Sequence, residues 1–209
     1  MSEKSFSKEL VVLVADIQQE KTLDTLLSHR NLSLGIRRAS YQIYRHPRKD
    51  AGVFGEADSF LRPFLNSHRY ALVLLDAAWD GAPGNARYLQ DDLMRRLCAN
   101  GWNRKRCQVI VIDPELETWI WSESEEVPRI LRTTWNIIKI TAQKHGYWAE
   151  NETKPSHPKE LLEILLISQK RPRSSSLFQN LARNVGLSKC QDPAFVLLRA
   201  TLQQWFPPT

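Results

Sequence analysis

The chain has 209 residues, of which 42% are hydrophobic and 25% charged, a composition that indicates one globular domain and excludes a wholly disordered chain. No apolar run reaches the roughly 18 to 20 residues of a membrane-spanning helix, and residues 1–9 lack the apolar segment of a signal peptide, so we expect a cytoplasmic protein without a membrane partner. The formal net charge of +6 favours a nucleic-acid partner, although a solvated basic surface would give the same excess.

Four segments have the patterns of β-strands. Three are short apolar runs rich in β-branched side chains, typical of strands buried on both faces, and they cover residues 10–15 (LVVLVA), 70–75 (YALVLL) and 107–112 (CQVIVI). A fourth, residues 39–45 (ASYQIYR), alternates apolar and polar side chains as an edge strand does.

Helical segments are expected between these strands. Leucine spacing predicts a helix at 22–27 after a loop and first turn at 18–21. A second helix is expected at 85–99, after the turn-rich loop that follows the strand at 70–75. Pro47 and two glycines predict a loop over 46–55, followed by a helix at 56–65 that Pro63 bends or shortens. Strands alternating with helices predict an α/β fold with a mostly parallel sheet flanked by helices.

The remainder of the chain is expected to be helical. Residues 115–121 (ELETWIW) have the pattern of a helix start after Pro114, and amphipathic segments follow at 127–140, 158–167, 178–185 and 193–206. We therefore expect an α/β core over residues 1–124 and a helical extension over residues 125–209 packed on that core. The cysteines are odd in number and scattered, which indicates reduced structural thiols; they are Cys98, Cys107 and Cys190.

Carboxylates follow each of the three buried strands. They are Asp16 and Glu20 after the first, Asp76 and Asp80 after the second, and Asp113, Glu115 and Glu117 after the third. Because the carboxyl ends of parallel strands share one edge of the sheet, these oxygens can gather there and suit Mg²⁺. The alternative is that each acid caps the helix that follows it, as Asp113 before Pro114 indicates most clearly.

Five segments together resemble a Toprim-related family of domains of unknown function found in bacterial antiphage defence loci. The likeness covers most of the chain, and the segments are VVLVADIQQEKTLDTLL, YALVLLDAAWDG, VIVIDPELETWIWSES, KPSHPKELLEIL and DPAFVLLRATLQQW. The resemblance implies a Toprim-like fold and a cytoplasmic bacterial protein that works with other defence proteins. Toprim domains use a glutamate and a D-x-D pair to hold Mg²⁺ in nucleases, primases and topoisomerases.

Carried over residue by residue, the resemblance implies a set of site residues. Glu20, Asp76 and Glu117 are the expected catalytic residues, and the expected Mg²⁺ ligands are Asp16, Glu20, Asp76, Asp80 and Glu117. Independently of the resemblance, the net positive charge and the cluster of basic residues over 37–49 make Arg45, Arg48 and Lys49 the expected nucleic-acid contacts. The function implied is Mg²⁺-dependent phosphodiester processing of nucleic acid, that is, an antiviral nuclease.

This chain departs from the Toprim pattern at two places. Ile17 follows Asp16 where the family usually has glutamate then glycine, and Ala78 stands where the second aspartate of the pair is expected. A second hypothesis is therefore a degenerate, non-catalytic subunit that binds a partner protein or nucleic acid in a defence complex. A third is an enzyme acting on a small molecule at the same sheet edge. Trp119 and Trp121 fit either a stacking platform for bases or, as is more typical of such spacing, the core.

Overall fold

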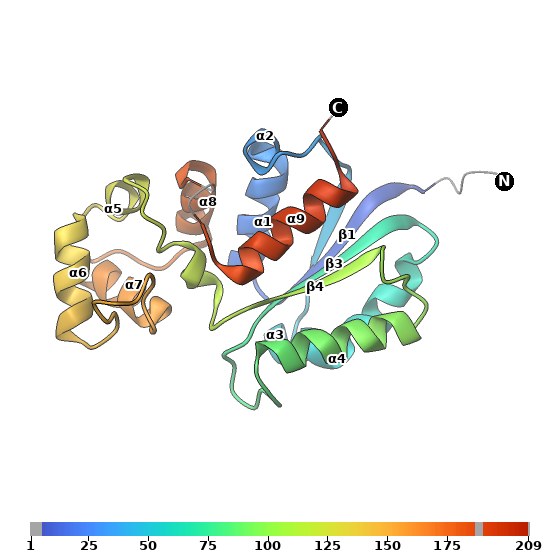
Figure 1. The fold of residues 1–209 in the computed structure, drawn as a ribbon, viewed down its shortest axis with the longest axis horizontal. Helices are drawn as coiled ribbons and strands as arrows, with labels where there is room; N and C mark the ends of the chain where they lie inside the picture. The colour runs from blue at the N-terminus through green and yellow to red at the C-terminus, as the bar shows by residue number, and fades with distance from the viewer. Residues whose placement is uncertain (1–5, 187–189, 209) are drawn as a thin grey trace.

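The computed structural model describes residues 6–186 and 190–208. It is an α/β protein built on a four-stranded, all-parallel sheet with strand order β2-β1-β3-β4 (Figure 1). This confirms the predicted fold class and places all four strands close to their expected positions. Their bounds are β1 Lys8–Val14, β2 Tyr41–Arg45, β3 His68–Asp76 and β4 Cys107–Ile112.

The continuous apolar runs reflect burial of the sheet on both faces. Successive side chains of a strand point to opposite faces, so Val12 and Leu72 enter one hydrophobic cluster while Leu13 and Val73 enter the other. All four side chains are fully buried. Strand β2 at the edge is only half-buried, which explains its alternating sequence.

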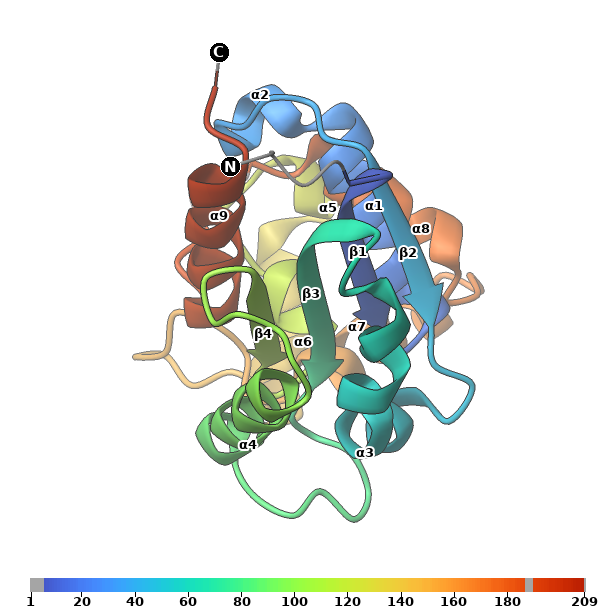
Figure 2. The ribbon, with the colours of Figure 1, turned by 90° about the vertical axis from the view of Figure 1, so that its right-hand side faces the viewer.

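Helices cover both faces of the sheet. Figures 1 and 2 show α3 and α4 on one side and α9 on the other, with α1 and α2 beside α9. The indole of Trp205 on α9 stacks on Tyr70 of β3, with ring centres 4.7 Å apart. The bounds of these helices are α1 Ile17–His29, α2 Asn31–Leu34, α3 Lys49–Leu61, α4 Ala86–Ala99 and α9 Pro193–Trp205.

Among the described residues, four further α-helices lie between β4 and α9 in the sequence. Helices α5, α6 and α7 lie at the end of the molecule away from the sheet, and α8 lies between them and α1 (Figure 1). Their bounds are α5 Glu126–Ile130, α6 Trp135–Lys144, α7 Pro158–Ser168 and α8 Ser175–Asn184. The boundary between a core and an extension at residues 124 and 125 stays a prediction, and α9, from the far end of the chain, packs directly against β4.

Two predicted helices begin much earlier than expected. Helix α1 starts at Ile17, because Asp16 accepts a hydrogen bond from the Gln19 N–H (2.8 Å) and caps it, so residues 18–21 are all helical where a loop followed by the first turn was expected. Helix α3 starts at Lys49 rather than at residue 56. Its Gly52 is required by close packing, since a Cβ there would lie 2.0 Å from Nδ1 of His46.

Two other expectations about helices were wrong. The segment predicted as one helix over 127–140 is two helices, because Arg132 has φ of 52° and Thr134 caps a new helix through Ile137. Residues after Pro114 form only a short 3-10 helix, η2 (Leu116–Trp119), whose cap position is Glu115. Asp113 is exposed and does not cap it, so the capping interpretation of Asp113 was also wrong.

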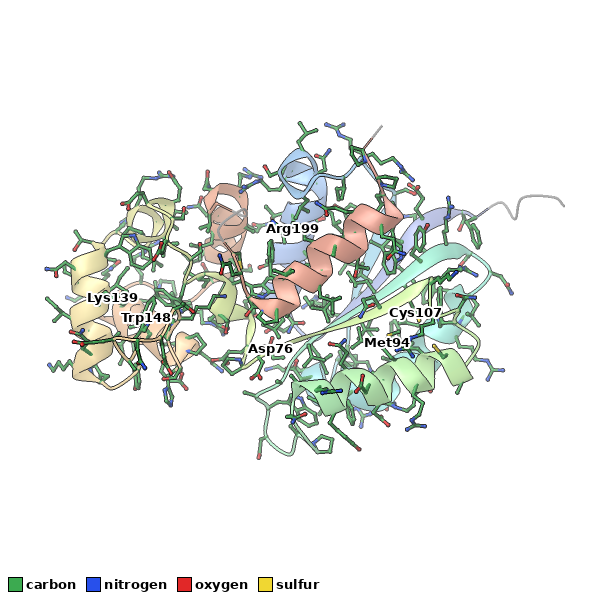
Figure 3. All side chains as sticks on the ribbon, viewed as in Figure 1. Asp76, Met94, Cys107, Lys139, Trp148 and Arg199 are labelled. Carbon is green, nitrogen blue, oxygen red and sulfur yellow. The ribbon has the colours of Figure 1, made fainter. Side chains whose placement is uncertain are left out.

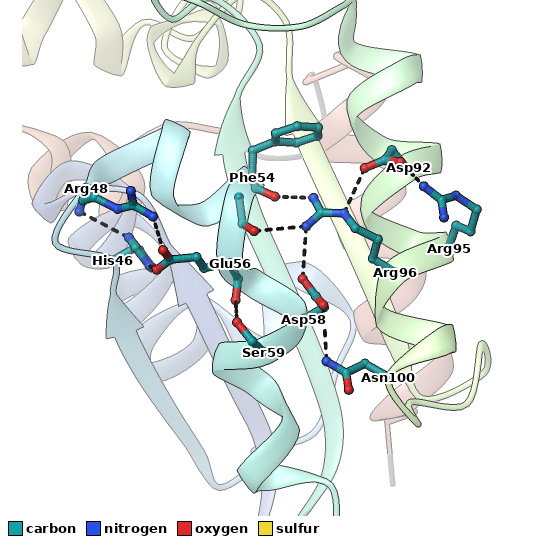
Figure 4. Close-up of polar contacts among 11 residues, drawn as sticks. His46, Arg48, Phe54, Glu56, Asp58, Ser59, Asp92, Arg95, Arg96 and Asn100 are labelled. Atoms are coloured by element: carbon teal, nitrogen blue, oxygen red, sulfur yellow. Dashed lines mark hydrogen bonds and ion pairs between the residues drawn. The ribbon is translucent and has the colours of Figure 1, made fainter.

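Polar contacts join α3 to α4 beneath the sheet (Figure 4). The Arg96 guanidinium donates to Asp58 (3.0 Å) and Asp92 (2.9 Å) and to the Phe54 carbonyl at the middle of α3. On the other side of α3, the buried His46 contacts Glu56 (3.0 Å), which also pairs with Arg48. These contacts hold α3 and the short loop after β2 in place.

Within the described residues, no helix is both long and apolar enough to span a bilayer.

Candidate functional site

The sheet topology directs attention to the carboxyl ends of β1 and β3. These strands are neighbours, but β1 continues into α1 on one face of the sheet while β3 continues into α4 on the other. Ligands of open parallel sheets bind where connections diverge in this way. Asp16 follows β1 and Asp76 ends β3, and Figure 3 marks Asp76 where the sheet meets the C-terminal helices.

Asp76 is held by a neutral amide and by a second acid. Gln19, itself almost fully buried, donates from Nε2 to Asp76 Oδ1 (3.0 Å) while its Oε1 accepts from the Ala15 N–H (2.9 Å). Asp50, in the first turn of α3, accepts a hydrogen bond from the Asp76 backbone N–H (2.9 Å). Gln19 and Asp50 thereby join the ends of β1 and β3 to the start of α3.

The electrostatics of this group disfavour negative charge. Burial raises the pKa of Asp76 well above its usual range, and the nearby carboxylates Asp50, Glu117, Asp16 and Glu115 raise it further. Burial likewise raises the pKa of Asp50, with a further contribution from Asp16. The pKa of Glu115 rises to about 7 through burial and the neighbouring Glu117. The structure therefore gathers five carboxyl groups close enough to repel one another, namely Asp16, Asp50, Asp76, Glu115 and Glu117.

Among the described residues, the ion pairs to this acidic cluster are made at Glu115 and Glu117. Arg173 pairs with Glu117, which is 1% exposed, and the Lys159 ammonium lies 3.7 Å from Glu115. The ion pairs among the described residues do not include Asp16, Asp50 or Asp76. Neutralisation of the carboxylates at the β1 and β3 ends therefore requires bound protons or an external cation.

Not all of the expected site residues lie in the acidic cluster. Asp16, Asp76 and Glu117 do, and Asp16 also serves as the α1 cap. Glu20 turns toward β2, where it pairs with Arg45 (2.6 Å) and Lys21 (3.1 Å). Asp80 is exposed in the loop after β3, outside the interactions that shift the pKa of Asp76.

Sequence reasoning missed Asp50 and Gln19. Asp50 was missed because the segment 46–55 was interpreted as a loop. In the structure, α3 begins at Lys49, and its first turn places Asp50 at the strand ends. Gln19 was placed in the loop and first turn after β1, without a role at the strand ends. A cap at Asp16 followed three residues later by glutamine is a recognised sign of a helix start, and it could have revealed both the helix and the amide.

The expected nucleic-acid contacts extend from the last residue of β2 to the first residue of α3, and Lys49 precedes the acidic-cluster residue Asp50 in the chain. Arg45, Arg48 and Lys49 are exposed, and Arg48 and Arg45 are engaged by Glu56 and Glu20. Lys49 has φ of 49°, a left-handed conformation that is uncommon for a lysine, and immediately precedes Asp50. Positive side chains thus border the β2 side of the acidic cluster.

The tryptophans after β4 belong to the core. Trp119 and Trp121 are 8% and 1% exposed, and their indole N–H groups donate to Asp192 and to the Pro158 carbonyl. This excludes them as an open stacking platform and confirms the core interpretation. Cys98, Cys107 and Cys190 are free thiols.

Neither the arrangement of ligating residues nor similarity to other proteins identifies the site. Among the described residues, no three His, Cys, Asp or Glu side chains are grouped as a ready metal cage. Comparisons with protein-family models, curated proteins and solved structures return no match.

Proposed function

We propose that this protein carries out Mg²⁺-dependent phosphodiester processing of nucleic acid, as a Toprim-like component of a bacterial defence system. The observation that carries the proposal is the gathering of Asp16, Asp50 and Asp76 at the β1 and β3 ends without a cationic partner. The Toprim-like resemblance of the sequence supplies the reaction class and the defence context.

The donor set suits a hard divalent cation. Mg²⁺ keeps several of its waters and is commonly bound through one or two carboxylates together with substrate phosphates, so a complete protein cage is not required. Asp76 and Asp16 would hold the ion, and Asp50 would take part directly or through water. Bound Mg²⁺ would polarise a phosphoryl oxygen and help to position a nucleophile. Arg48 and Lys49, exposed beside Asp50, would neutralise the phosphates of the substrate.

The decisive experiment is calorimetric titration with Mg²⁺ and Mn²⁺, with and without a short nucleic acid. We compare the wild type with Asp76→Asn, which keeps the side-chain shape, and with Asp91→Asn as a control, because Asp91 is exposed on α4. Metal binding should be lost in Asp76→Asn and retained in Asp91→Asn, and cleavage of nucleic acid should follow the same pattern. Equal binding and cleavage by all three proteins would refute the proposal.

A second candidate is a non-catalytic subunit that uses the same fold to bind a partner. Ala78 stands at the expected second acid of the D-x-D pair, and the Gln19 amide occupies Asp76 Oδ1. This candidate predicts association with nucleic acid or protein that is unchanged by EDTA, by Mg²⁺ or by Asp76→Asn. A metal-dependent cleavage abolished by that substitution would rule it out.

A further inference from the structure

A groove at the far end of the molecule has features of a separate binding site. It lies among residues 121–125, α6 and residues 148–153, and has a volume of about 640 Å³. A second hollow of about 540 Å³ adjoins it and shares part of its wall, including Trp121, Ser122 and Thr153. Each hollow has a volume in the range of small-ligand sites, and none of the five acidic-cluster residues lines either hollow.

Three tryptophans form part of the groove wall, and two of them, Trp121 and Trp148, are almost fully buried. Trp121 and Trp148 meet edge to face with ring centres 6.2 Å apart, and Trp135 at the start of α6 is half-buried beside them. The indole N–H groups of Trp121 and Trp148 are bonded to the carbonyls of Pro158 (3.1 Å) and Glu152 (2.9 Å). These bonds hold the two indoles in place.

The rim of the groove is acidic although the chain as a whole is basic. Four glutamates and one lysine line it, giving a formal charge of −3 (four negative, one positive) against +6 for the whole chain. The glutamates are Glu123, Glu125, Glu150 and Glu152. Such a rim repels phosphates and attracts organic cations.

The molecule already places an ammonium group in this groove. The Lys139 Nζ lies 3.3 Å from the centre of the Trp148 ring, a cation–π contact that Figure 3 locates on α6 and the following segment. Burial against the protein lowers the pKa of Lys139, and Glu123 opposes that effect. Lys139 therefore shows what kind of group the aromatic wall accepts.

A buried hydroxyl in the wall lacks a partner. Ser122 is 5% exposed and lines both hollows, yet its Oγ makes no hydrogen bond among the described residues. An unsatisfied buried hydroxyl costs free energy that a ligand can recover by bonding to it. The wall thus combines tryptophan side chains, negative charge and a hydroxyl group without a hydrogen-bond partner among the described residues.

From these features we propose that the groove binds a lysine side chain of an extended segment of a partner protein, in competition with Lys139. The segment's ammonium lies on the Trp148 face among the glutamates, and its backbone runs along the adjoining hollow, where Ser122 and Thr153 bond to it. A peptide fits better than a free amine because the two hollows extend well beyond the volume of one ammonium group. This site is independent of the acidic cluster.

The test uses the full chain and a fluorescein-labelled Gly-Lys-Gly-Lys-Gly peptide, with binding followed by fluorescence polarisation. Lys139→Met should tighten binding roughly two- to thirtyfold, the range of one cation–π contact, because it frees the Trp148 face. Lys144→Met removes the same charge from an exposed position on α6 and should change binding less than about twofold. Equal effects of the two substitutions would overturn the competition with Lys139.

Three further comparisons test the chemistry of the groove. The double variant Glu125→Gln/Glu150→Gln should weaken binding about tenfold, whereas Asp91→Asn should not change it. Ser122→Ala should weaken binding without lowering the melting temperature, since the hydroxyl has no partner to lose. Equal binding of a norleucine peptide, full competition by an equimolar free alkylamine, or no saturable binding by either wild type or Lys139→Met would each refute the proposal.

Discussion

Asp76 is a residue whose chemistry conflicts with its surroundings. Its carboxyl either stays charged among other carboxylates or takes up a proton, and at neutral pH both outcomes cost folding free energy. Asparagine at this position keeps an oxygen that accepts the hydrogen bond from the Gln19 amide. Its NH₂ group can also donate hydrogen bonds to the neighbouring carboxylates. We therefore expect Asp76→Asn to stabilise the metal-free protein by about 1–3 kcal/mol, which raises the melting temperature by roughly 3–10 °C.

Thermal denaturation in EDTA at pH 7.5 measures this effect. Asp91→Asn, on the exposed face of α4, serves as the control and should leave the melting temperature unchanged. A lower melting temperature for Asp76→Asn would mean that the carboxylate supports the fold, and the argument from like-charge repulsion would then be wrong. Stabilisation combined with loss of metal binding is the usual mark of a strained functional site.

Glu117 differs from Asp76 because it has a cationic partner. It is almost fully buried and pairs with Arg173, whose guanidinium also lies 5.3 Å from the Phe178 ring. Arg173→Met keeps the apolar contact but leaves a buried charge unpaired, so we expect a loss of about 3–5 kcal/mol. Urea denaturation should show that adding Glu117→Gln restores most of that loss. No recovery in the double variant would indicate that packing, rather than charge, dominates.

Only part of the acidic cluster could be predicted at the residue scale. Asp16 and Asp76 were identified because each follows a buried apolar run, and the end of such a run is readable in the sequence. Glu20 sits one helical turn after Asp16, yet it turns to Arg45 on the neighbouring strand. That choice depends on the β1–β2 pairing, which local sequence does not encode. Asp50 was missed because the start of its helix was misplaced.

At the scale of elements, the strands were predictable and the helix ends were not. The strands are apolar on both faces because both faces are covered, and this leaves a strong pattern. Helix α3 contains Gly52 and Gly55, which normally mark loops, and contact between Gly52 and His46 outweighs that local preference. The break between α5 and α6 at Arg132 carries no proline or glycine signal.

Helix α9 belongs to the layer that covers the sheet, so its contacts should be essential for folding. Trp205 is 5% exposed, stacks on Tyr70 of β3 and donates to the Lys105 carbonyl (3.2 Å). We expect Trp205→Ala to cost about 3–5 kcal/mol of unfolding free energy. Val196→Ala on the same helix, where Val196 is 40% exposed, should cost well under about 1 kcal/mol. Similar small losses for both would show that α9 is dispensable to the core.

For the whole molecule, carboxyl groups with lowered pKa values and carboxyl groups with raised pKa values have opposite effects on stability as the pH changes. Together they should place the maximum of the unfolding free energy in mildly acidic solution. Arg37 lowers the pKa of Glu9, and Arg95 and Arg96 lower that of Asp92 despite the opposing effect of burial. Groups with lowered pKa stabilise the fold above their unfolded pKa values, and this contribution is lost as the pH falls. Such pairs are partly exposed, so their individual effects are small.

Carboxyl groups with raised pKa values act in the opposite direction. The folded state binds their protons more tightly than the unfolded chain does. Their contribution to the free energy of unfolding is therefore fully present below the unfolded pKa and is lost as the pH rises through the folded pKa. For Glu115 this window runs from its usual 4.5 to about 7, and Asp50 and Asp76 share the direction. His68, whose pKa burial lowers, opposes the trend below about pH 6.5.

The contribution of the acidic cluster can be isolated by comparing Glu115→Gln with the wild type from pH 4.5 to 7.5. The unfolding free energy of the wild type should fall relative to the variant across this window, by about 1–2 kcal/mol once solvent screening of the partly buried Glu115 is allowed for. Millimolar Mg²⁺ at pH 7.5 should reverse most of the difference if the acidic cluster holds the ion, since a bound cation replaces the missing protons. If the unfolding free energies of the two proteins have the same pH dependence in EDTA, the repulsion among these carboxylates is contradicted. If they differ in EDTA and Mg²⁺ does not change the difference, the repulsion is supported but the metal site is not, which favours the non-catalytic candidate.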